Sequence, residues 1–400
     1  MREFVRYYLL KVLVVIVVLQ LAFFYWLENR NHRPEAVNDE VSVYEGHTVK
    51  IRPLRNDTDK DDNKLSIGQV NNPLKGSLKQ EDDIFVYTAI KGFAGVDSFT
   101  YTVNDGKKES NEAYIKVTVN ENLPPEANND LIVSYPENKI PLLITGNDTD
   151  REGDSLFIDN YTTPLYGKIE KENNQLYYIP VKPALKDSFQ YTVSDGFKFS
   201  KTATVTINIK NKNSGIYPWL SRDIGNPQQK GNVKIKNNEL FVMGSGNDIW
   251  NNVDNFHYAY QLVEGDFEMV TKALTLENTN QWAKIGIMAR ESLTGESRNA
   301  YMCMSSQNGT NCQFRTSTGS GSISENQRGD IAVPHWLKLV RAGNKFTGYR
   351  SPDGKEWIQV NEETLDVPSV IYLGIGVTSH DDSKLCTATI DLSKTKIIKK

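Results

Sequence analysis

Residues 97–106 read DSFTYTVNDG and residues 187–196 read DSFQYTVSDG, so one ten-residue pattern occurs twice in the chain. In each copy Phe, Tyr and Val alternate with Ser, Thr or Gln, which is the period-two pattern of a half-buried β-strand. Both copies end at an Asp-Gly pair, which favours a tight turn between two strands. The pattern therefore predicts one strand and one turn, repeated after 90 residues.

The repeat extends well beyond this strand. Asn56-Asp57-Thr58-Asp59 recurs as Asn147-Asp148-Thr149-Asp150, and Pro34-Glu35-Ala36 recurs as Pro125-Glu126-Ala127. Self-similarity at a fixed period is the signature of repeated structural units. Units of about 90 residues with many short strands and regular turn signals are typical of Greek-key β-sandwiches. We therefore expect two such modules, at residues 34–121 and 122–212.

Taken in order, the motifs P-x-A, N-D-T-D and D-S-F-x-Y-T-V-x-D-G resemble the bacterial cadherin-like, Ig-like repeats of surface and adhesin proteins. The resemblance covers residues 34–211, and both copies carry all three motifs. It implies an extended string of sandwiches that calcium can stiffen.

Each module also carries a loop rich in carboxylates at alternate positions. Ca²⁺ takes six to eight oxygen ligands in flexible geometry, and clustered carboxylates repel one another without a cation. The alternative is an ordinary turn in which Asp and Asn side chains cap their own backbone. The candidate Ca²⁺ ligands are Asp57, Asp59 and Asp61 in the first module and Asp148, Asp150, Glu152 and Asp154 in the second, with Asp39 and Asp130 as remote ligands.

The repeat stops after residue 212, and the composition changes. Five of the six Trp and all three Cys lie beyond this point. Strand-like runs such as residues 336–341 continue, turn dipeptides such as Asn308-Gly309 separate them, and no stretch has a helical period. Residues 213–400 are therefore predicted to form another β-sandwich, and the fold class is all-β.

Several segments of this region resemble a concanavalin-like bacterial β-sandwich family of ill-defined function, often appended to exported sugar-active enzymes. The resemblance covers residues 222–393 and implies the fold but no activity. It is carried by the segments 244–250, 256–266, 282–291, 336–341, 351–357 and 374–380.

Tryptophan supplies the best candidates for a ligand site in this region. An exposed indole can stack on a sugar ring while polar neighbours bind the hydroxyl groups. Trp250 and Trp282, each close to Asn residues, and Arg290 are the candidate ligand-binding residues. Burial in the core is the alternative for both Trp, and pairing with acidic residues is the alternative for the Arg.

Catalysis is not expected. Glu264, Asp266 and Glu268 have the alternate spacing by which some glucanases place a nucleophile and a general acid on one strand. However, Gly265-Asp266 is a turn signal, and a turn there would break the alternation. The sequence also contains no nucleophile elbow, zinc-protease motif, P-loop or dinucleotide fingerprint.

The three cysteines exclude a disulfide-rich scaffold. Cys303 and Cys312 flank the Asn308-Gly309 turn and could face each other across a hairpin. A disulfide between them is predicted if the chain is exported to an oxidising compartment.

The N-terminal region predicts a membrane anchor at residues 1–33. Residues 12–27 read VLVVIVVLQLAFFYWL, and the 21 residues from Tyr7 to Leu27 would span roughly 31 Å as a helix, enough for a bilayer core. A cleaved signal peptide and a buried helix are the alternatives; the bulky residues after the apolar run argue against cleavage. Basic residues before the run place the N-terminus in the cytoplasm and the bulk of the chain outside.

A net charge of −4 gives no basic footprint for nucleic acid. The sequence thus predicts a non-catalytic, membrane-anchored, exported protein. Its C-terminal sandwich would bind a glycan or a cell-surface protein, presented on a calcium-stiffened stalk at the cell envelope. The alternatives are an adhesion protein whose cadherin-like modules make the contacts and, less favoured, a glycan hydrolase.

Overall fold

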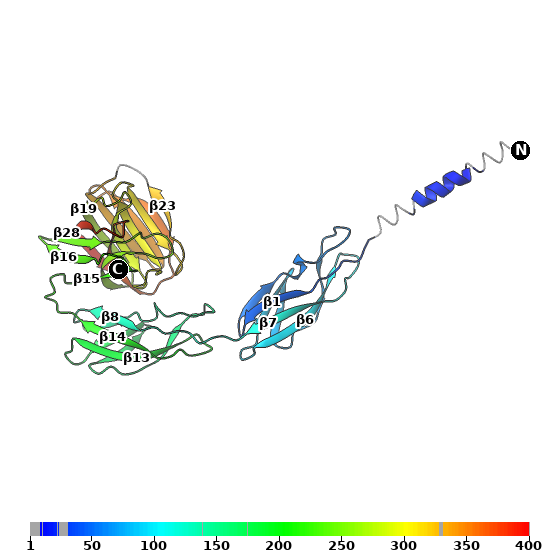
Figure 1. Ribbon diagram of the computed structural model, residues 1–400, viewed down its shortest axis with the longest axis horizontal. Helices are drawn as coiled ribbons and strands as arrows, with labels where there is room; N and C mark the ends of the chain where they lie inside the picture. The colour runs from blue at the N-terminus through cyan, green and yellow to red at the C-terminus, as the bar shows by residue number, and fades with distance from the viewer. Residues whose placement is uncertain are drawn as a thin grey trace. The chain divides into compact units, whose positions relative to one another are not determined.

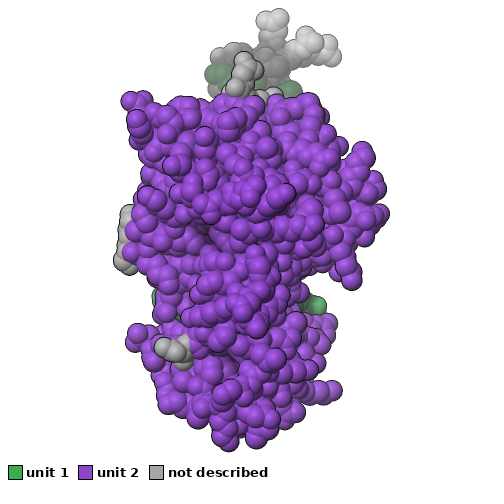
Figure 2. All heavy atoms as spheres, turned by 90° about the vertical axis from the view of Figure 1, so that its left-hand side faces the viewer, with its two compact units in different colours: residues 1–123 green, residues 124–400 purple. Residues whose placement is uncertain are grey.

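The computed structural model describes residues 9, 11–21, 23, 31–137, 139–173, 175–327 and 331–399. Contacts within the chain divide it into two compact units, residues 1–123 and 124–400 (Figure 2). The predicted boundary at residue 212 falls inside the second unit, which holds both the second repeat and the C-terminal sandwich.

Residues 11–21 are helical and lie within the predicted anchor (Figure 1). Among the described residues, no helix combines the length and apolar character needed to cross a membrane. Residues 1–8, 10, 22 and 24–30 of the predicted anchor segment, 1–33, lie outside the described residues. The anchor therefore stays a prediction.

The first repeat is a sandwich of two antiparallel-rich sheets with a short 3₁₀ helix, η1 (Pro53–Arg55). One sheet has the order β1 (Asp39–Tyr44), β7 (Ala113–Asn120), β6 (Gly95–Asn104) and β3 (Ser66–Val70). The other has the order β2 (Thr48–Ile51), β5 (Ile84–Ala89) and β4 (Gly76–Glu81). As the alternation predicts, Phe99, Tyr101 and Val103 of β6 point into the core and are at most 3% exposed.

The second repeat has the same plan. One sheet has the order β10 (Phe157–Tyr161), β13 (Lys186–Ser194), β14 (Ala203–Ile209) and β8 (Asp130–Ser134), and the other has the order β11 (Gly167–Glu172), β12 (Gln175–Pro180) and β9 (Ile140–Leu142). In both repeats the first strand pairs in parallel with the last one, β1 with β7 and β8 with β14. The two copies therefore share their topology as well as their motifs.

The C-terminal region is a sandwich of two seven-stranded sheets. The first, sheet G, has the order β15 (Leu220–Ile224), β18 (Phe256–Glu264), β27 (Val370–Thr378), β20 (Lys284–Arg290), β21 (Asn299–Ser305), β22 (Thr310–Arg315) and β23 (Ile323–Gln327). The second, sheet H, has the order β16 (Asn232–Lys236), β17 (Glu239–Gly244), β28 (Cys386–Lys399), β19 (Phe267–Leu276), β24 (His335–Ala342), β25 (Lys345–Ser351) and β26 (Ile358–Thr364). The predicted all-β fold class is confirmed.

The central strands of sheet G, β20, β21 and β27, are buried on both faces. Ile285 and Ile287 of β20 point into the core between the two sheets, whereas Met288 belongs to a second apolar cluster on the outer face. Tyr135 of the second repeat joins that outer cluster, and its hydroxyl donates a hydrogen bond of 2.9 Å to the Trp219 carbonyl oxygen. The second repeat thus covers part of the outer face of sheet G.

Candidate functional site

A cavity of about 300 Å³ opens on the outer face of sheet G. Its wall comes from the loop after β17, the start of β20 and the loop before it, the strand β22, and the loop after β27. The residues that line it are Asp248, Trp250, Trp282, Lys284, Asn311, Gln313 and His380.

The cavity contains both predicted ligand-binding tryptophans. Trp250 and Trp282 are each half-buried, so neither indole is absorbed into the core. Their loops are held by hydrogen bonds: the Trp282 N–H donates to Asn280 Oδ1 at 2.9 Å, and the Trp250 carbonyl accepts from the Ser322 N–H at 2.9 Å. The two loops are separated in sequence, and the fold brings their indoles to one cavity.

An ion pair lies beside the indoles. The Lys284 ammonium contacts Asp248 Oδ1, although the lysine is only 4% exposed. The same Asp248 oxygen accepts a 2.7 Å hydrogen bond from the Ile249 N–H, and His380 Nδ1 lies 3.4 Å from Asp248 Oδ2. A buried ammonium is costly without a partner, so Asp248 is what allows a lysine at this position.

Gln313 completes the floor of the cavity. Cys312 and Phe314, its neighbours on β22, belong to the core between the sheets, so Gln313 points to the outer face. It is 3% exposed, and its Oε1 atom is buried without a hydrogen-bond partner. A buried polar atom normally has a partner, so Gln313 Oε1 stands out as an unsatisfied acceptor in a residue of the cavity wall.

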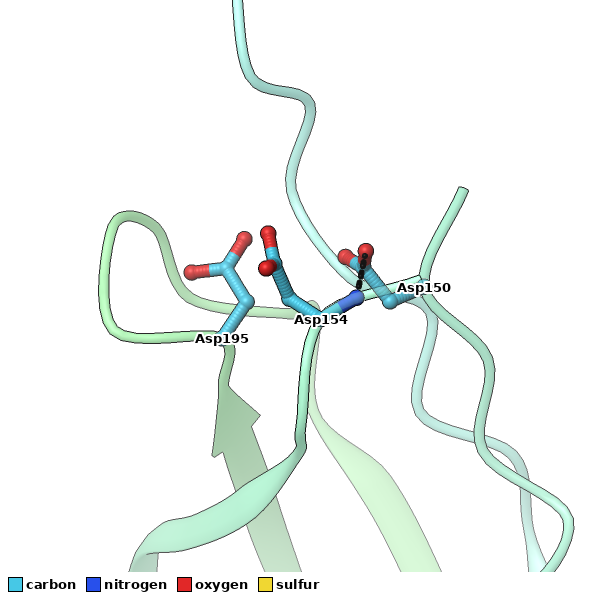
Figure 3. Close-up of side chains that lie close together, drawn as sticks. All are labelled: Asp150, Asp154 and Asp195. Atoms are coloured by element: carbon cyan, nitrogen blue, oxygen red, sulfur yellow. Dashed lines mark hydrogen bonds between the residues drawn. The ribbon is translucent and has the colours of Figure 1, made fainter. Parts of the chain in front are cut away.

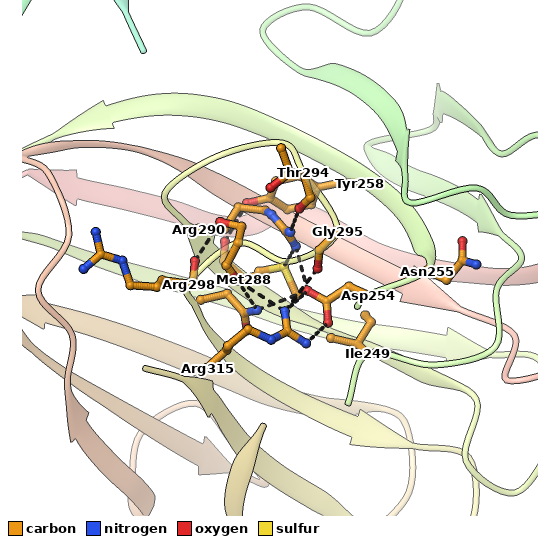
Figure 4. Close-up of polar contacts among 12 residues, drawn as sticks. Ile249, Asp254, Asn255, Tyr258, Met288, Arg290, Thr294, Gly295, Arg298 and Arg315 are labelled. Carbon is orange, nitrogen blue, oxygen red and sulfur yellow. Dashed lines mark hydrogen bonds and ion pairs between the residues drawn. The ribbon is translucent and has the colours of Figure 1, made fainter. Parts of the chain in front are cut away.

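Arg290 does not line the cavity, and its predicted role in ligand binding is corrected by its position. Arg290 and Arg315 are at most 1% exposed and share one buried carboxylate, Asp254 (Figure 4). The Arg315 Nη2 to Asp254 Oδ1 distance is 2.6 Å, and the Arg290 Nη1 to Asp254 Oδ2 distance is 3.2 Å. Burial lowers the pKa of Arg290, which the Asp254 charge opposes. Its other contacts are to the backbone carbonyls of Ser292 and Thr294 and to the Met288 sulfur, so this cluster holds the fold together.

The predicted Cys303–Cys312 disulfide is also corrected, because the strand register differs from the one assumed. Cys303 pairs with Asn311, and Cys312 pairs with Met302. The two thiols therefore point to opposite faces of sheet G, and both are free and buried. Burial raises the pKa of the Cys303 thiol to about 12.

The acidic loop of the second repeat brings three carboxylates together. Asp150, Asp154 and Asp195 each offer an oxygen, and these atoms lie within 4.8 Å of one another (Figure 3). Asp195 is 6% exposed, and its Oδ2 atom and that of Asp150 are buried without hydrogen-bond partners. The predicted ligands Asp150 and Asp154 are thus joined by Asp195, which the sequence analysis did not include, whereas Glu152 is not part of the group.

The corresponding loop of the first repeat is arranged differently. Asn31 Nδ2 donates to Asp105 Oδ2 at 2.6 Å, and the His32 ring lies 2.7 Å from Asp61 Oδ1. Asp59 Oδ1 accepts a 2.8 Å hydrogen bond from the Asp61 N–H. Within the described residues, this repeat holds no comparable group of three carboxylates.

The other predicted ligands surround a buried tyrosine in each repeat. The Tyr191 hydroxyl lies 2.9 Å from Asp130 Oδ2 and 3.0 Å from Asp148 Oδ1, and Tyr101 makes equivalent contacts to Asp39 and Asp57. Burial raises the pKa of Asp130 to about 8 and that of Asp148 to about 6. These four carboxylates therefore already have a phenol as a partner.

The glucanase-like spacing does not produce a pair of carboxylates on one strand. Glu264 ends β18 in sheet G, and Glu268 lies on β19 in sheet H. Gly265, with φ of 77°, and Asp266 connect the two sheets, as the turn signal indicates. The Glu264 Oε1 atom accepts a 2.7 Å hydrogen bond from the Tyr177 hydroxyl of the second repeat.

The residues not predicted from the sequence are Asp248, Lys284, Asn311, Gln313 and His380 in the cavity and Asp195 in the acidic loop. Lys284 had a usable signal, since it is the one charged residue near the start of the otherwise apolar run AKIGIMA at 283–289. Asp195 was assigned only to a turn, although the Asp-Gly pair recurs in both repeats. Gln313 and His380 had no local signal.

Comparison with known families supports the first two sandwiches. Residues 31–118 and 122–208 each match the model of the bacterial Ig domain. A stretch of 72 residues is 39% identical to Protein GAMETE EXPRESSED 2 from Arabidopsis thaliana; the match covers 18% of this chain and 8% of that protein. The predicted Ig-like architecture of the repeats is therefore confirmed.

Solved structures with some similarity include a functionally unknown protein from Saccharomyces cerevisiae, 14% identical, with a TM-score of 0.37 over 46% of this chain and 95% of that one. The carbohydrate-binding module CBM66 from Bacillus subtilis is 13% identical, with a TM-score of 0.32 over 45% of this chain and 94% of that one. The exoplasmic/lumenal domain of VIP36, in a Ca²⁺/Man3GlcNAc-bound form, is 11% identical, with a TM-score of 0.33 over 48% of this chain and 90% of that one.

Proposed function

We propose that this chain is a non-catalytic, exported and membrane-anchored protein whose C-terminal sandwich, of concanavalin-like type, binds a carbohydrate in the cavity between Trp250 and Trp282. The observation that carries the proposal is the position of the two indoles. Both are half-buried, and both line one cavity of about 300 Å³. Ligand sites in proteins combine such aromatic walls with a few polar groups, here the pair Lys284–Asp248.

Glycan screening of the full chain tests this proposal. Trp250→Ala and Trp282→Ala should each weaken binding to the recognised polysaccharide by about tenfold or more, because each removes an apolar face from the cavity. Trp357→Ala is the matched control, since its indole lies against Lys338 on sheet H, with the ammonium 4.3 Å from the ring centre. Binding that survives both cavity variants, or no binding to any polysaccharide, would direct the search to a protein partner instead.

The absence of catalysis is part of the proposal. It is supported by the separation of Glu264 and Glu268 onto strands of two different sheets. A retaining or inverting glycosidase needs two carboxyl groups that flank one bond. Glycan hydrolysis by the full chain that is abolished by Glu264→Gln or Glu268→Gln would contradict this part of the proposal.

A second candidate function is binding of Ca²⁺ by the acidic loop of the second repeat. It is favoured by the carboxylate group of Asp150, Asp154 and Asp195, and independently by the buried Asp195 Oδ2 atom, which has no partner. Hard oxygen ligands of this kind suit Ca²⁺, which would neutralise the repulsion between the carboxylates. Bound Ca²⁺ would join the segments that carry Asp150 and Asp195 and so stiffen this end of the repeat.

Thermal unfolding of the full chain with Ca²⁺ and with a chelator tests the second candidate. Saturation at 100 times the dissociation constant should stabilise the second unit by about 2.7 kcal/mol. Asp195→Asn should remove this response, and the equivalent change in the first repeat, Asp105→Asn, should leave it unchanged. A melting temperature that ignores Ca²⁺ would mean that the acidic loop is an ordinary turn.

A further inference from the structure

The lysine and the carboxylate in the wall of the cavity on sheet G compensate each other, which bears on the kind of sugar that the cavity can hold. Its lining includes one cation, Lys284, and one anion, Asp248, and these two already form an ion pair. The remaining lining groups are the two indoles, the amides of Asn311 and Gln313, and the imidazole of His380. A ligand with its own charge would therefore meet no uncompensated partner in the cavity, and a buried unpaired charge is costly.

Asp248 also disfavours an anionic ligand directly. A carboxylate or sulfate placed near its Oδ2 atom would be repelled by like charge, whereas a hydroxyl could donate a hydrogen bond to it. Lys284, held by Asp248, retains N–H groups that can donate to a hydroxyl oxygen, because an ammonium has three donors. The ion pair thus offers one acceptor and one donor side by side, which matches hydroxyl groups on adjacent ring carbons.

Gln313 supplies the most specific signal. Its Oε1 atom is buried without a hydrogen-bond partner, and the residue is only 3% exposed. Leaving a buried polar atom unsatisfied is costly, so a ligand that brings an O–H group to this atom would recover that cost. A hydroxyl both donates and accepts, and it therefore satisfies an amide in either orientation.

The backbone at His380 is consistent with a wall shaped for a ligand. Its φ is 52°, in the left-handed region that few residues other than glycine adopt. Such conformations persist where the surrounding structure enforces them, often at ligand sites. Here the conformation places the imidazole beside Asp248, with Nδ1 3.4 Å from Oδ2.

From these observations we infer that the cavity selects an uncharged pyranose residue with free hydroxyl groups, and that Gln313, Lys284 and Asp248 are its specificity-determining residues. Trp250 and Trp282 hold the ring, and the three polar side chains bind its hydroxyls. This inference rests on the proposed carbohydrate-binding function and narrows it to neutral sugars, excluding uronates and sulfated sugars.

The test uses the full chain on a polysaccharide panel with a neutral set (glucan, mannan, galactan and xylan) and an acidic set (alginate, pectate and dextran sulfate). Binding to one or more neutral members, at least about tenfold stronger than to any acidic one, is the expected result. Binding to acidic members alone would overturn the inference and leave the proposed function standing. Binding to neither set would overturn both.

Variants assign the selectivity to the named residues. Gln313→Leu and Lys284→Met should each weaken binding to the neutral polysaccharide by about tenfold or more, and Gln359→Leu, an exposed position on β26, is the matched control. If Gln313→Leu fails to fold, Gln313→Asn keeps the amide but withdraws it from the cavity by one methylene and should weaken binding in the same direction. Unchanged binding in a folded Gln313 variant would overturn the inference.

Discussion

The two repeats contain the same loop but satisfy its carboxylates in different ways. In the first repeat, Asn63 Nδ2 donates to Asn31 Oδ1 at 3.0 Å, and Asn31 Nδ2 donates to Asp105 Oδ2 at 2.6 Å. In the second repeat, Asp154 occupies the position of Asn63, and its N–H donates to Asp150 Oδ1 at 2.9 Å, just as the Asn63 N–H donates to Asp59 Oδ1 at 3.3 Å. The backbone of the loop is therefore equivalent, and the side chains differ.

This difference bears on the proposed Ca²⁺ site. An amide supplies N–H donors to a neighbouring carboxylate, and in the first loop Asn63 and Asn31 donate to Asp59 Oδ1 and Asp105 Oδ2, although Asp59 Oδ2 is buried without a partner. A third carboxylate supplies no donor, and Asp195 Oδ2 is left without a partner in the second loop. Ca²⁺ is predicted from the sequence for both modules, and the group of three carboxylates favours the second one.

The largest expected difference between the repeats concerns pH. The Tyr191 cluster is buried deeply enough to raise the pKa of Asp130 to about 8 and that of Asp148 to about 6. An aspartate in an unfolded chain has a pKa of about 3.9. The folded second unit therefore binds a proton on Asp130 or Asp148 more tightly than the unfolded chain does. The protonated carboxyls therefore stabilise the folded second unit fully below about pH 4, and this stabilisation is lost as the pH rises to about 8.

Asp130→Asn tests this pH dependence. In the presence of a chelator, it should stabilise the second unit at pH 8.5 by about 1–3 kcal/mol, because a neutral amide replaces a desolvated charge, and it should flatten the pH profile. Hydrogen exchange measured peptide by peptide reports on each unit separately. Asp39→Asn in the first repeat is the matched control, and an equal or larger effect there would remove the distinction between the two clusters.

A smaller effect is expected when the residue at one equivalent position, Asn63 or Asp154, is replaced by its counterpart from the other loop. Asp154→Asn should stabilise the second repeat by about 1 kcal/mol without Ca²⁺, because it removes one of three carboxylates that lie within 4.8 Å of one another. The same change should abolish the response to Ca²⁺. Asn63→Asp, the reciprocal change, should destabilise the first repeat by a similar amount. Chemical denaturation with and without Ca²⁺ measures both, and a second loop that loses stability in Asp154→Asn without Ca²⁺ would contradict the comparison.

The smallest effect is expected from His32→Ala in the first repeat. Hydrogen bonds from the backbone N–H of His32, and then from its ring, lower the pKa of Asp61. The backbone contact remains in the alanine variant, and partly exposed ion pairs contribute little to stability. The melting temperature of the first unit should therefore change too little to resolve, while the Asp61 pKa, followed by NMR titration, should rise. A large loss of stability would show that the loop depends on this ring.

The outcomes for the candidate ligand site follow one rule. The partial exposure of Trp250 and Trp282 at a cavity could be predicted, because both indoles have polar residues as neighbours in the sequence. Arg290 could not, because its role depends on Asp254, a residue 36 positions away that becomes fully buried beside it. The prediction of a disulfide between Cys303 and Cys312 was wrong for a related reason, because a shift of one residue in strand register turns a side chain to the opposite face of the sheet.

What the sequence alone determined is the part that depends on short-range patterns: the strands of each repeat, their turns, the all-β class and the equivalence of the two Ig-like sandwiches. These follow from residues within a few positions of one another, because alternation and turn chemistry act locally. Only the tertiary structure decided which buried polar groups have partners. Gln313 Oε1 and Asp195 Oδ2 are unsatisfied, whereas Asp254 is enclosed by two arginines. Hydrogen bonds and ion pairs depend on distances of about 3 Å between segments that are far apart in the chain, and no local pattern encodes them.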